Sequence, residues 1–127
     1  MPKGTVLVVE DEAMIGLEVS LVLRNSGYSV PQVVMSSDDV IKNVMQEKPD
    51  LILCDIRIGG ILDGVEAIQR IRLINSEIPV VYMTAYGDRT TCRRAMKTNP
   101  VAILDKPVLH EVLVNTIDKA LVGSVQT

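Results

Sequence analysis

Aromatic residues and positive charge are both scarce in this chain. It has no Trp and no Phe, and it has three Tyr. Lys and Arg number 13 against 16 Asp and Glu, which gives a formal net charge of −3. Nucleic-acid binders neutralise phosphates with basic side chains, and those that bind single strands also stack bases on aromatic rings. The composition therefore argues against direct nucleic-acid binding.

Cysteine and long apolar runs are also lacking. Cys54 and Cys92 are the only two cysteines, which is too few for a disulfide framework or a four-ligand zinc site. No apolar run approaches the roughly 18 residues of a membrane span. The first apolar run is short and ends at Glu10, so it does not predict a signal peptide. We therefore expect a cytoplasmic protein that does not enter the membrane.

The length of the chain fits one domain and is too short for two. The 127 residues are 47% apolar and 23% charged, which excludes a disordered segment and allows a core without disulfides. We assign residues 1–123 to this domain and residues 124–127 to a loose C-terminal tail. The mean hydropathy of +0.27 is high for a chain without a membrane span, and the pattern along the chain explains it.

Five short runs rich in Val and Ile predict the strands. Each run is nearly continuous rather than alternating, which is typical of strands that are buried on both faces of a parallel sheet. Such a sheet raises the mean hydropathy without any membrane segment. The predicted strands are Thr5–Val9, Ser29–Val34, Leu51–Cys54, Val80–Met83 and Val101–Leu104.

Stretches with helical spacing of apolar residues separate the strands and follow the last one. Their predicted ends are marked by Gly27 after the first helix, Ser36 and Ser37 before the second, Pro49 after the second, Pro79 after the third, Asp88 and Pro100 around the fourth, and Gly123 after the fifth. The alternation of strands and helices predicts an α/β fold, a doubly wound five-stranded parallel sheet with five helices.

Polar residues at the strand ends indicate where the chemistry lies, because ligands of open parallel sheets bind at the carboxyl ends of the strands. Glu10 and Asp11 follow the first predicted strand, Asp55 the third, Thr84 the fourth and Lys106 the fifth. Carboxylates that lie together repel one another unless a cation lies among them. Mg²⁺ prefers oxygen ligands and fits this set, whereas the lack of a His or Cys cluster argues against zinc.

The other two side chains at the strand ends fit a phosphoryl group. Lys106 supplies a positive point charge, and Thr84 supplies a hydrogen-bond donor. A carboxylate can also act as a nucleophile and form an aspartyl phosphate. The strand ends therefore indicate phosphoryl chemistry on a carboxylate that lies beside a metal ion.

Five segments, in order along the chain, resemble the response-regulator receiver domain of two-component signalling, the CheY-like family. These segments are VLVVEDE, DLILCDIR, DGVEAIQRIR, PVVYMTAYGD and LDKPV. The resemblance runs from about Lys3 to about Leu121, and five such segments in order are far more specific than any one of them. It implies a flavodoxin-like sheet with strand order 2-1-3-4-5.

The resemblance also implies a role for each residue of the site. Asp55 would be the phosphoacceptor. Glu10, Asp11 and Asp55 would hold Mg²⁺ together with the backbone carbonyl of Arg57. Of the acidic pair, Asp11 would be the more direct ligand.

The remaining implied roles concern the phosphoryl group and the switch. Thr84 would donate to the phosphoryl group and Lys106 would pair with it, and the bond from Lys106 to Pro107 would be cis. A sensor histidine kinase would donate the phosphoryl group from a phosphohistidine. The surface of the fourth strand, fourth helix and fifth strand would then change for an output partner or domain that the sequence does not identify. The resemblance leaves open a phosphorylation-dependent homodimer through the face of the fourth and fifth helices.

Three positions depart from the family pattern. The loop at residues 56–63 is one residue longer than the commonest form and contains two glycines instead of a proline. Ile103 occupies the position of the usual switching aromatic residue, which puts the usual coupling in doubt and leaves open a replacement by Tyr86. Asp105 adds a carboxylate beside Lys106, and it can point the other way along its strand.

Each site residue also has a structural interpretation. The acidic run at residues 10–12 can favour a helix N-terminus through the macrodipole, Thr84 can be a strand residue and Lys106 can belong to a turn. Cys54 is expected in the core, Cys92 is expected to be inert and His110 is expected to face solvent. The three arginines of the fourth helix, at positions 89, 93 and 94, are expected on a solvated face, with a docking surface as the alternative.

Three other functions compete with the receiver. A haloacid-dehalogenase-like phosphatase also uses a nucleophilic Asp, but it needs a second Asp two residues later, where this chain has Arg57. A flavodoxin-like cofactor carrier needs a Gly- and hydroxyl-rich phosphate loop after the first strand, where this chain has acidic residues. A receiver that acts only as a docking module would not need the intact site. We therefore expect a phosphorylatable switch rather than an enzyme.

Overall fold

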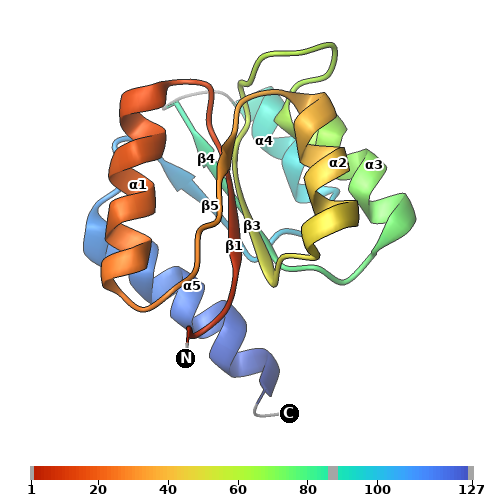
Figure 1. Cartoon of the computed structure of the whole chain (residues 1–127). Helices are drawn as coiled ribbons and strands as arrows, with labels where there is room; N and C mark the ends of the chain where they lie inside the picture. Colours follow the sequence, from red (N-terminus) through yellow and green to blue (C-terminus); the bar gives the residue numbers. More distant parts are fainter. Residues whose placement is uncertain (1, 86–88, 126–127) are drawn as a thin grey trace.

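The computed structural model describes residues 2–85 and 89–125, which form a sheet between two layers of helices (Figure 1). The strands of the described residues are parallel and lie in the order β2-β1-β3-β4-β5. They are β1 Val6–Val9, β2 Val33–Val34, β3 Leu51–Asp55, β4 Val80–Thr84 and β5 Ala102–Asp105. The predicted strand order is confirmed.

The helices cover both faces of the sheet. They are α1 Ala13–Asn25, α2 Ser37–Glu47, α3 Gly64–Ile74, α4 Arg89–Met96 and α5 His110–Val125. In Figure 1, α1 and α5 lie on one side of the sheet and α2, α3 and α4 lie on the other. The predicted doubly wound α/β fold is confirmed, because each connection between neighbouring strands crosses one face of the sheet.

Two apolar cores explain why the strands are nearly continuous runs of Val, Ile and Leu. Side chains alternate between the faces of a strand, so Val6 and Val8 of β1 pack in the core that includes α1 and α5. Leu7 and Val9 pack in the core that includes α2, α3 and α4. All four residues of β1 are at most 2% exposed. A strand that is covered on both faces needs apolar residues at every position.

Local sequence signals define the helix ends. Ser36 begins α2 by accepting a hydrogen bond from the backbone N–H of Asp39, and Asp63 begins α3 in a reciprocal capping box with Glu66. Gly27 follows α1 with a φ of 99°, as expected for a helix C-terminus.

Two predicted helix ends are not confirmed by the structure. The predicted start of the fourth helix at Asp88 lies outside the described residues, as does Tyr86. The last helix continues to Val125, two residues past the Gly123 that was expected to end it. The domain boundary at residue 123 stays a prediction.

The second strand is shorter than predicted. The sequence predicted a strand over Ser29–Val34, whereas β2 contains only Val33 and Val34, preceded by an isolated bridge between Thr5 and Ser29. Pro31 lies between these two pairings and has no N–H to donate. The edge of the sheet is therefore interrupted at the proline.

Three strands end one residue later than predicted. β3, β4 and β5 end at Asp55, Thr84 and Asp105, and each of these residues is paired with a neighbouring strand. Two of the predicted site residues, Asp55 and Thr84, are thus fixed by the register of the sheet rather than held in loops.

Candidate functional site

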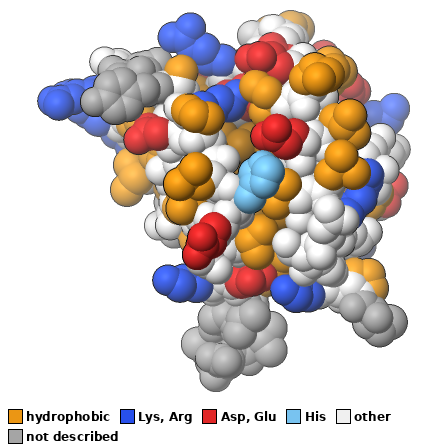
Figure 2. Space-filling model, turned by 90° about the vertical axis from the view of Figure 1, so that its left-hand side faces the viewer, with side chains coloured by type: hydrophobic (Ala, Val, Ile, Leu, Met, Phe, Trp, Pro, Cys, Tyr) orange, Lys and Arg blue, Asp and Glu red, His pale blue; other side chains and the backbone are white. Residues whose placement is uncertain are grey.

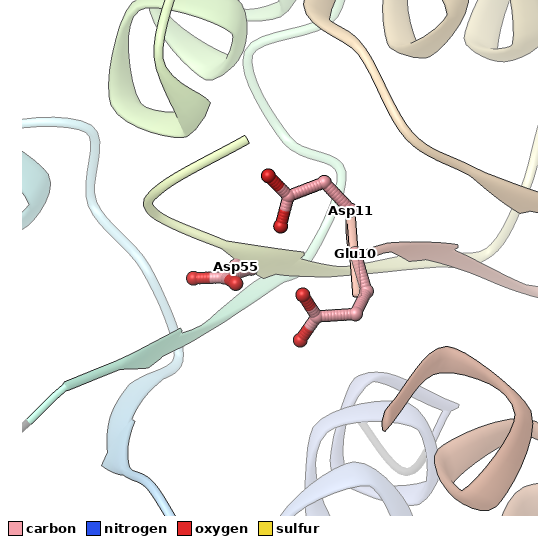
Figure 3. Close-up of side chains that lie close together, drawn as sticks. All are labelled: Glu10, Asp11 and Asp55. Atoms are coloured by element: carbon pink, nitrogen blue, oxygen red, sulfur yellow. The ribbon is translucent and has the colours of Figure 1, made fainter. Parts of the chain in front are cut away.

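Three carboxylates meet where β1 and β3 end, which is the predicted edge of the sheet. Glu10 follows β1, and its backbone N–H donates to the carbonyl of Val34 at 3.0 Å. Asp55 ends the adjacent β3. One oxygen each from Glu10, Asp11 and Asp55 can be chosen so that all lie within 4.8 Å of one another (Figure 3). Adjacent parallel strands therefore bring together residues that are far apart in the sequence.

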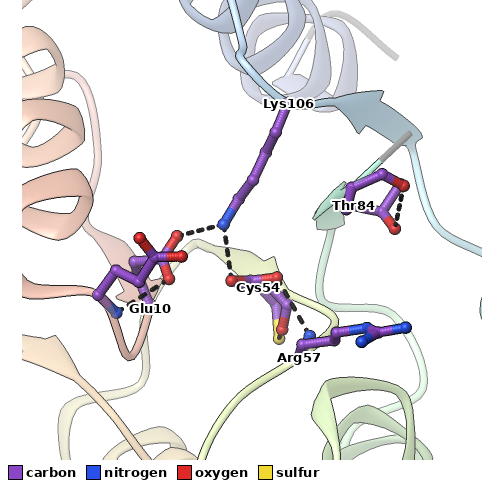
Figure 4. Close-up of polar contacts among 8 residues, drawn as sticks. Glu10, Cys54, Arg57, Thr84 and Lys106 are labelled. Atoms are coloured by element: carbon purple, nitrogen blue, oxygen red, sulfur yellow. Dashed lines mark hydrogen bonds and ion pairs between the residues drawn. The ribbon is translucent and has the colours of Figure 1, made fainter.

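Lys106 bridges two of these carboxylates. Its Nζ donates to Glu10 Oε1 at 2.7 Å and to Asp55 Oδ2 at 2.7 Å (Figure 4). Its backbone N–H donates to the carbonyl of Thr84 at 2.8 Å, which fixes the start of the connection after β5. The peptide bond to Pro107 is cis, as expected. The ammonium group partly compensates the charge of the cluster.

Burial dominates the electrostatics of Glu10, whose side chain is 0% exposed. Burial is the largest cause, and together with the hydrogen bond and negative charge of Asp55 it raises the pKa of Glu10 to about 7, against the opposing hydrogen bonds of Lys106 and of the Glu12 backbone. Burial alone would lower the pKa of Lys106, but the hydrogen bonds to Asp55 and Glu10 raise it above its usual value. The surroundings therefore favour the charged form of Lys106 and, below about pH 7, the protonated form of Glu10.

The donor set fits a hard divalent cation. The three clustered side chains are all carboxylates, and among the described residues no His or Cys belongs to the cluster. Oxygen ligands of this kind suit Mg²⁺, and a second positive charge would offset the repulsion that Lys106 leaves uncompensated. The backbone N–H of Arg57 donates to Asp55 Oδ1 at 3.1 Å, whereas the use of the Arg57 carbonyl as a ligand stays a prediction.

The loop at residues 56–63 lies against the start of α2. Its Gly59 forms an isolated bridge with Ser36, and the backbone N–H of Ser37 donates to the carbonyl of Gly59 at 3.1 Å. The backbone N–H of Leu62 donates to Ser37 Oγ at 3.2 Å. Gly60 has a φ of 102°, and a Cβ there would lie 2.7 Å from Ser37 Oγ. Glycine therefore allows the longer loop to pack closely at this point.

Gly64 is a positioning residue that the sequence analysis did not single out. Its backbone N–H donates to the carbonyl of Ile56 at 2.7 Å. A Cβ at this position would lie 2.3 Å from the backbone carbonyl oxygen of Asp55. The first residue of α3 therefore has to be glycine for the helix to begin against the end of β3. The Asp-Gly pair at positions 63 and 64 was the available signal.

Thr84 lies at the predicted edge but apart from the acidic cluster. It is 4% exposed, and its hydroxyl donates to the carbonyl of Ala85 at 3.3 Å (Figure 4). Ile103 is partly buried and packs against the core that includes α2, α3 and α4. Asp105 is exposed at the end of β5 and is not a member of the carboxylate cluster. The structure thus brings Glu10, Asp11, Asp55 and Lys106 together and leaves the hydroxyl of Thr84 outside.

The remaining predicted features are mostly as expected. Cys54 is fully buried, and burial raises the pKa of its thiol well above the usual range, while Cys92 is half-buried. His110 is exposed, and its Nε2 lies 3.5 Å from Glu18 Oε1. Arg94 differs from the expectation of a purely solvated face, because it forms an ion pair with Asp63 at 3.0 Å.

A family model described as "Response regulator receiver domain" matches residues 6–118. The chain is 32% identical over 125 residues to the transcriptional regulatory protein ZraR of Salmonella typhimurium, covering 98% of this chain and 28% of that protein. It is 28% identical over 121 residues to sporulation initiation phosphotransferase F of Bacillus subtilis, covering 95% of this chain and 96% of that protein.

A solved structure agrees with this match. The signal receiver domain of a modulated diguanylate cyclase from Desulfovibrio desulfuricans superposes with a TM-score of 0.88 at 30% identity, covering 98% of each chain. None of the helices in residues 2–85 and 89–125 combines the length and hydropathy that a membrane-spanning segment needs.

Proposed function

The chain belongs to the response regulator receiver domain family, and we propose that Asp55 accepts a phosphoryl group from the phosphohistidine of a sensor histidine kinase. The observation that carries this proposal is the placement of Lys106 Nζ at 2.7 Å from both Asp55 and Glu10. A carboxylate at a strand end, beside an ammonium group and a second buried carboxylate, has the surroundings that an aspartyl phosphate needs. Response regulators receive their input from sensor kinases.

The transfer step uses one oxygen of the Asp55 carboxylate as the nucleophile. This oxygen forms a bond to phosphorus while the bond from phosphorus to the donor's imidazole nitrogen breaks. The imidazole keeps the electron pair, and the product on this chain is an acyl phosphate. Lys106 already contacts Asp55 Oδ2, so its charge is in position to stabilise negative charge on the transferred group.

The residues that would hold Mg²⁺ are Glu10, Asp11 and Asp55, with the backbone carbonyl of Arg57 as a further ligand. When bound, the metal would neutralise negative charge on the carboxylate and phosphoryl oxygens. A divalent cation beside Glu10 would also favour its ionised form, against the burial that raises its pKa. The chain's own part is to keep this oxygen-rich edge preformed.

We propose that the chain then acts as a switch and not as an enzyme with turnover. The phosphoryl group adds negative charge at Asp55 and attracts the hydroxyl of Thr84, which lies outside the cluster in the present structure. The added charge would change the population of arrangements of β4, α4 and β5. An output partner or output domain would read that surface, and pairing of two copies across α4 and α5 on phosphorylation belongs to the same proposal.

The side of the molecule that carries α1 suits the approach of the phosphodonor. A cavity of about 300 Å³ lies beside Lys106, lined by apolar residues that include Ile15, Met83 and Val108. Figure 2 shows apolar side chains on both sides of the single histidine, His110, on this face. The helices α1 and α5 expose several apolar side chains, which are Met14, Leu17 and Leu21 in α1, and Val112 in α5. Such a patch beside the site fits a protein partner.

Labelling with a small phosphodonor tests the acceptor. Wild-type protein incubated with acetyl phosphate and Mg²⁺ should gain one phosphoryl group by mass spectrometry, and Asp55→Asn should gain none, because the amide is not a nucleophile of this kind. The matched control is Asp105→Asn, the same substitution at an exposed strand end outside the cluster. Full labelling of Asp55→Asn would place the acceptor elsewhere and refute the proposal.

Metal removal tests the acidic pair with two readouts. Chelation should abolish most of the labelling. Independently, Mg²⁺ at a hundredfold excess over its Kd should stabilise the wild type against unfolding by roughly 2.7 kcal/mol, and Asp11→Asn should lose most of this gain. Metal-independent labelling would contradict the ligand assignment, and steady turnover of a phosphate ester would favour a phosphatase instead.

A further inference from the structure

An ion pair links Arg94 of α4 to Asp63, the N-cap residue of α3. Arg94 Nη1 donates to Asp63 Oδ2 at 3.0 Å, and Arg94 Nη2 donates to Asp63 Oδ1 at 3.4 Å. The Asp63 side chain also accepts the backbone N–H of Glu66 at 2.8 Å as the N-cap of α3. The Arg94 and Asp63 side chains are 38% and 32% exposed. The pair therefore joins two helices at a point where one carboxylate is already held in place.

Asp63 is connected to Asp55 through short, constrained contacts. The backbone N–H of Arg57 donates to Asp55 Oδ1 at 3.1 Å, and the backbone N–H of Gly64 donates to the carbonyl of Ile56 at 2.7 Å. Gly64 lies so close to the Asp55 carbonyl that the end of β3 and the start of α3 are in direct backbone contact. Asp55 and Asp63 are therefore joined by a short loop that is held by hydrogen bonds at both of its ends.

The far end of α4 is held by a separate set of contacts. Thr98 Oγ1 lies 2.6 Å from the hydroxyl of Tyr82 and donates to the carbonyl of Ala95 at 2.6 Å. The guanidinium of Arg72 in α3 donates to the carbonyls of Thr98 at 2.9 Å and Ile78 at 2.6 Å. Tyr82 is fully buried, and Thr98 is 4% exposed. These buried contacts fix the turn after α4, whereas the partly exposed pair with Asp63 can open at little cost.

We propose that the Asp63–Arg94 ion pair is the contact through which the state of Asp55 is coupled to α4, and that it favours the unphosphorylated arrangement. This inference rests on the proposed function. Ile103 has no hydroxyl group and no ring and packs, partly buried, against the apolar core, so it offers no polar partner to a shifted Thr84. The ion pair instead joins α4 directly to the loop that follows the phosphoacceptor, and its two members can separate and pair again.

Thermodynamic linkage makes this coupling measurable as a change in the affinity of the Asp55 site for a phosphoryl mimic. If the pair stabilises the unphosphorylated arrangement, breaking it lowers the free energy that a phosphoryl group must supply to change that arrangement. The same variant then binds a phosphoryl mimic more tightly. An exposed ion pair of this kind changes an equilibrium by a factor of about three, so the expected gain in affinity is about threefold.

The experiment measures the affinity of the full chain for beryllofluoride, a phosphoryl mimic, in the presence of Mg²⁺. Arg94→Met removes the guanidinium, and Asp63→Asn weakens the pair while keeping a side chain that caps a helix well. Both single variants should bind about threefold more tightly, and the double variant should bind no more tightly than either. The matched control is Arg93→Met, a substitution at the exposed neighbouring position, which should leave the affinity unchanged.

A second readout separates coupling from a merely structural role. Amide hydrogen exchange in α4 of Arg94→Met without the mimic should move toward that of the wild type with the mimic. Wild-type affinity in Arg94→Met, weaker binding, or additive gains in the double variant would overturn the inference while leaving the proposed function intact. A wild type that binds no beryllofluoride and accepts no phosphoryl group at Asp55 would instead overturn the proposed function, and the inference with it.

Discussion

The acidic edge of β1 and β3 and the adjacent surface of β4, α4 and β5 are built in different ways. At the acidic edge, the backbone of two neighbouring strands positions Glu10 and Asp55, and Lys106 bonds to both at 2.7 Å. On the α4 side, the contacts are made by individual side chains, such as that of Arg94 in α4 with Asp63, the N-cap of α3. Both regions belong to one site in the proposed function, but the position of α4 depends on contacts outside the sheet.

In the proposed function, the residues of the acidic edge accept the phosphoryl group, and the contacts around α4 respond to it. A strand end in a parallel sheet has little freedom, because each residue is held by hydrogen bonds to its neighbours. A contact between helices depends on a few side chains and can form in more than one arrangement. We therefore expect changes at the acidic edge to affect stability strongly, and changes on the α4 side to affect it weakly.

Gly64→Ala is expected to have the largest effect on stability. A Cβ at residue 64 would lie 2.3 Å from the Asp55 carbonyl oxygen, so β3 or α3 has to move. Such overpacking against backbone should lower the free energy of unfolding by about 3 kcal/mol, as measured by urea denaturation. Gly59→Ala is the control, because its Cβ would meet the carbonyl oxygen of Met35 at 3.4 Å. A tolerated Gly64→Ala would mean that the acidic edge is less rigid than the backbone contacts indicate.

The second prediction concerns Glu10 in the metal-free protein. Its pKa is raised from 4.5 to about 7 on folding, so the folded chain binds this proton more tightly than the unfolded chain does. The contribution of Glu10 to stability should therefore increase as the pH falls from about 7 toward 4.5, by up to about 3 kcal/mol. Glu10→Gln should remove this dependence.

Denaturant titrations at pH 5, 6, 7 and 8 in the presence of a chelator would measure this dependence, with the exposed Glu12→Gln as control. A Glu10→Gln protein that keeps the wild-type pH profile would show that burial does not control the charge state of the acidic edge.

The difference between the acidic edge and the α4 side also explains which features the sequence could predict. The alternation of strands and helices, the acidic cluster and Lys106 follow from apolar runs and from the polar residues that end them, because a parallel sheet brings strand ends to one edge. The strand order follows only from the resemblance to the receiver family. The shortening of β2 does not follow from the apolar run alone, because Pro31 lies within that run and removes one backbone donor. The pairing of Arg94 with Asp63 depends on how α3 and α4 pack, and no spacing within one helix reports a contact with another.

The third prediction tests the buried contact at the end of α4. Tyr82→Phe removes the hydroxyl that lies 2.6 Å from Thr98 Oγ1, while the hydrogen bond from Thr98 to the Ala95 carbonyl remains. The loss of one buried hydrogen bond should lower the free energy of unfolding by about 1 kcal/mol. Labelling of Asp55 by acetyl phosphate should be unchanged, with Thr98→Ser as a conservative control. Loss of labelling would show that this contact also supports the acidic edge.

The smallest effect is expected from Ile103→Val, which separates packing from signalling at the position of the usual switching aromatic residue. Ile103 is only partly buried, so removing one methylene should lower the free energy of unfolding by about 0.5 kcal/mol. The control is Ile52→Val, at a fully buried position of the same core, which should lower it by about 1 kcal/mol. If the ion pair between Asp63 and Arg94 carries the coupling, Ile103→Val should keep the wild-type change in α4 hydrogen exchange on addition of beryllofluoride. A variant that keeps its stability but loses this response would contradict the role of the ion pair. It would show that the position of α4 is set by the shape of the apolar side chain at residue 103 of β5 and not by the polar contact of Arg94 with Asp63.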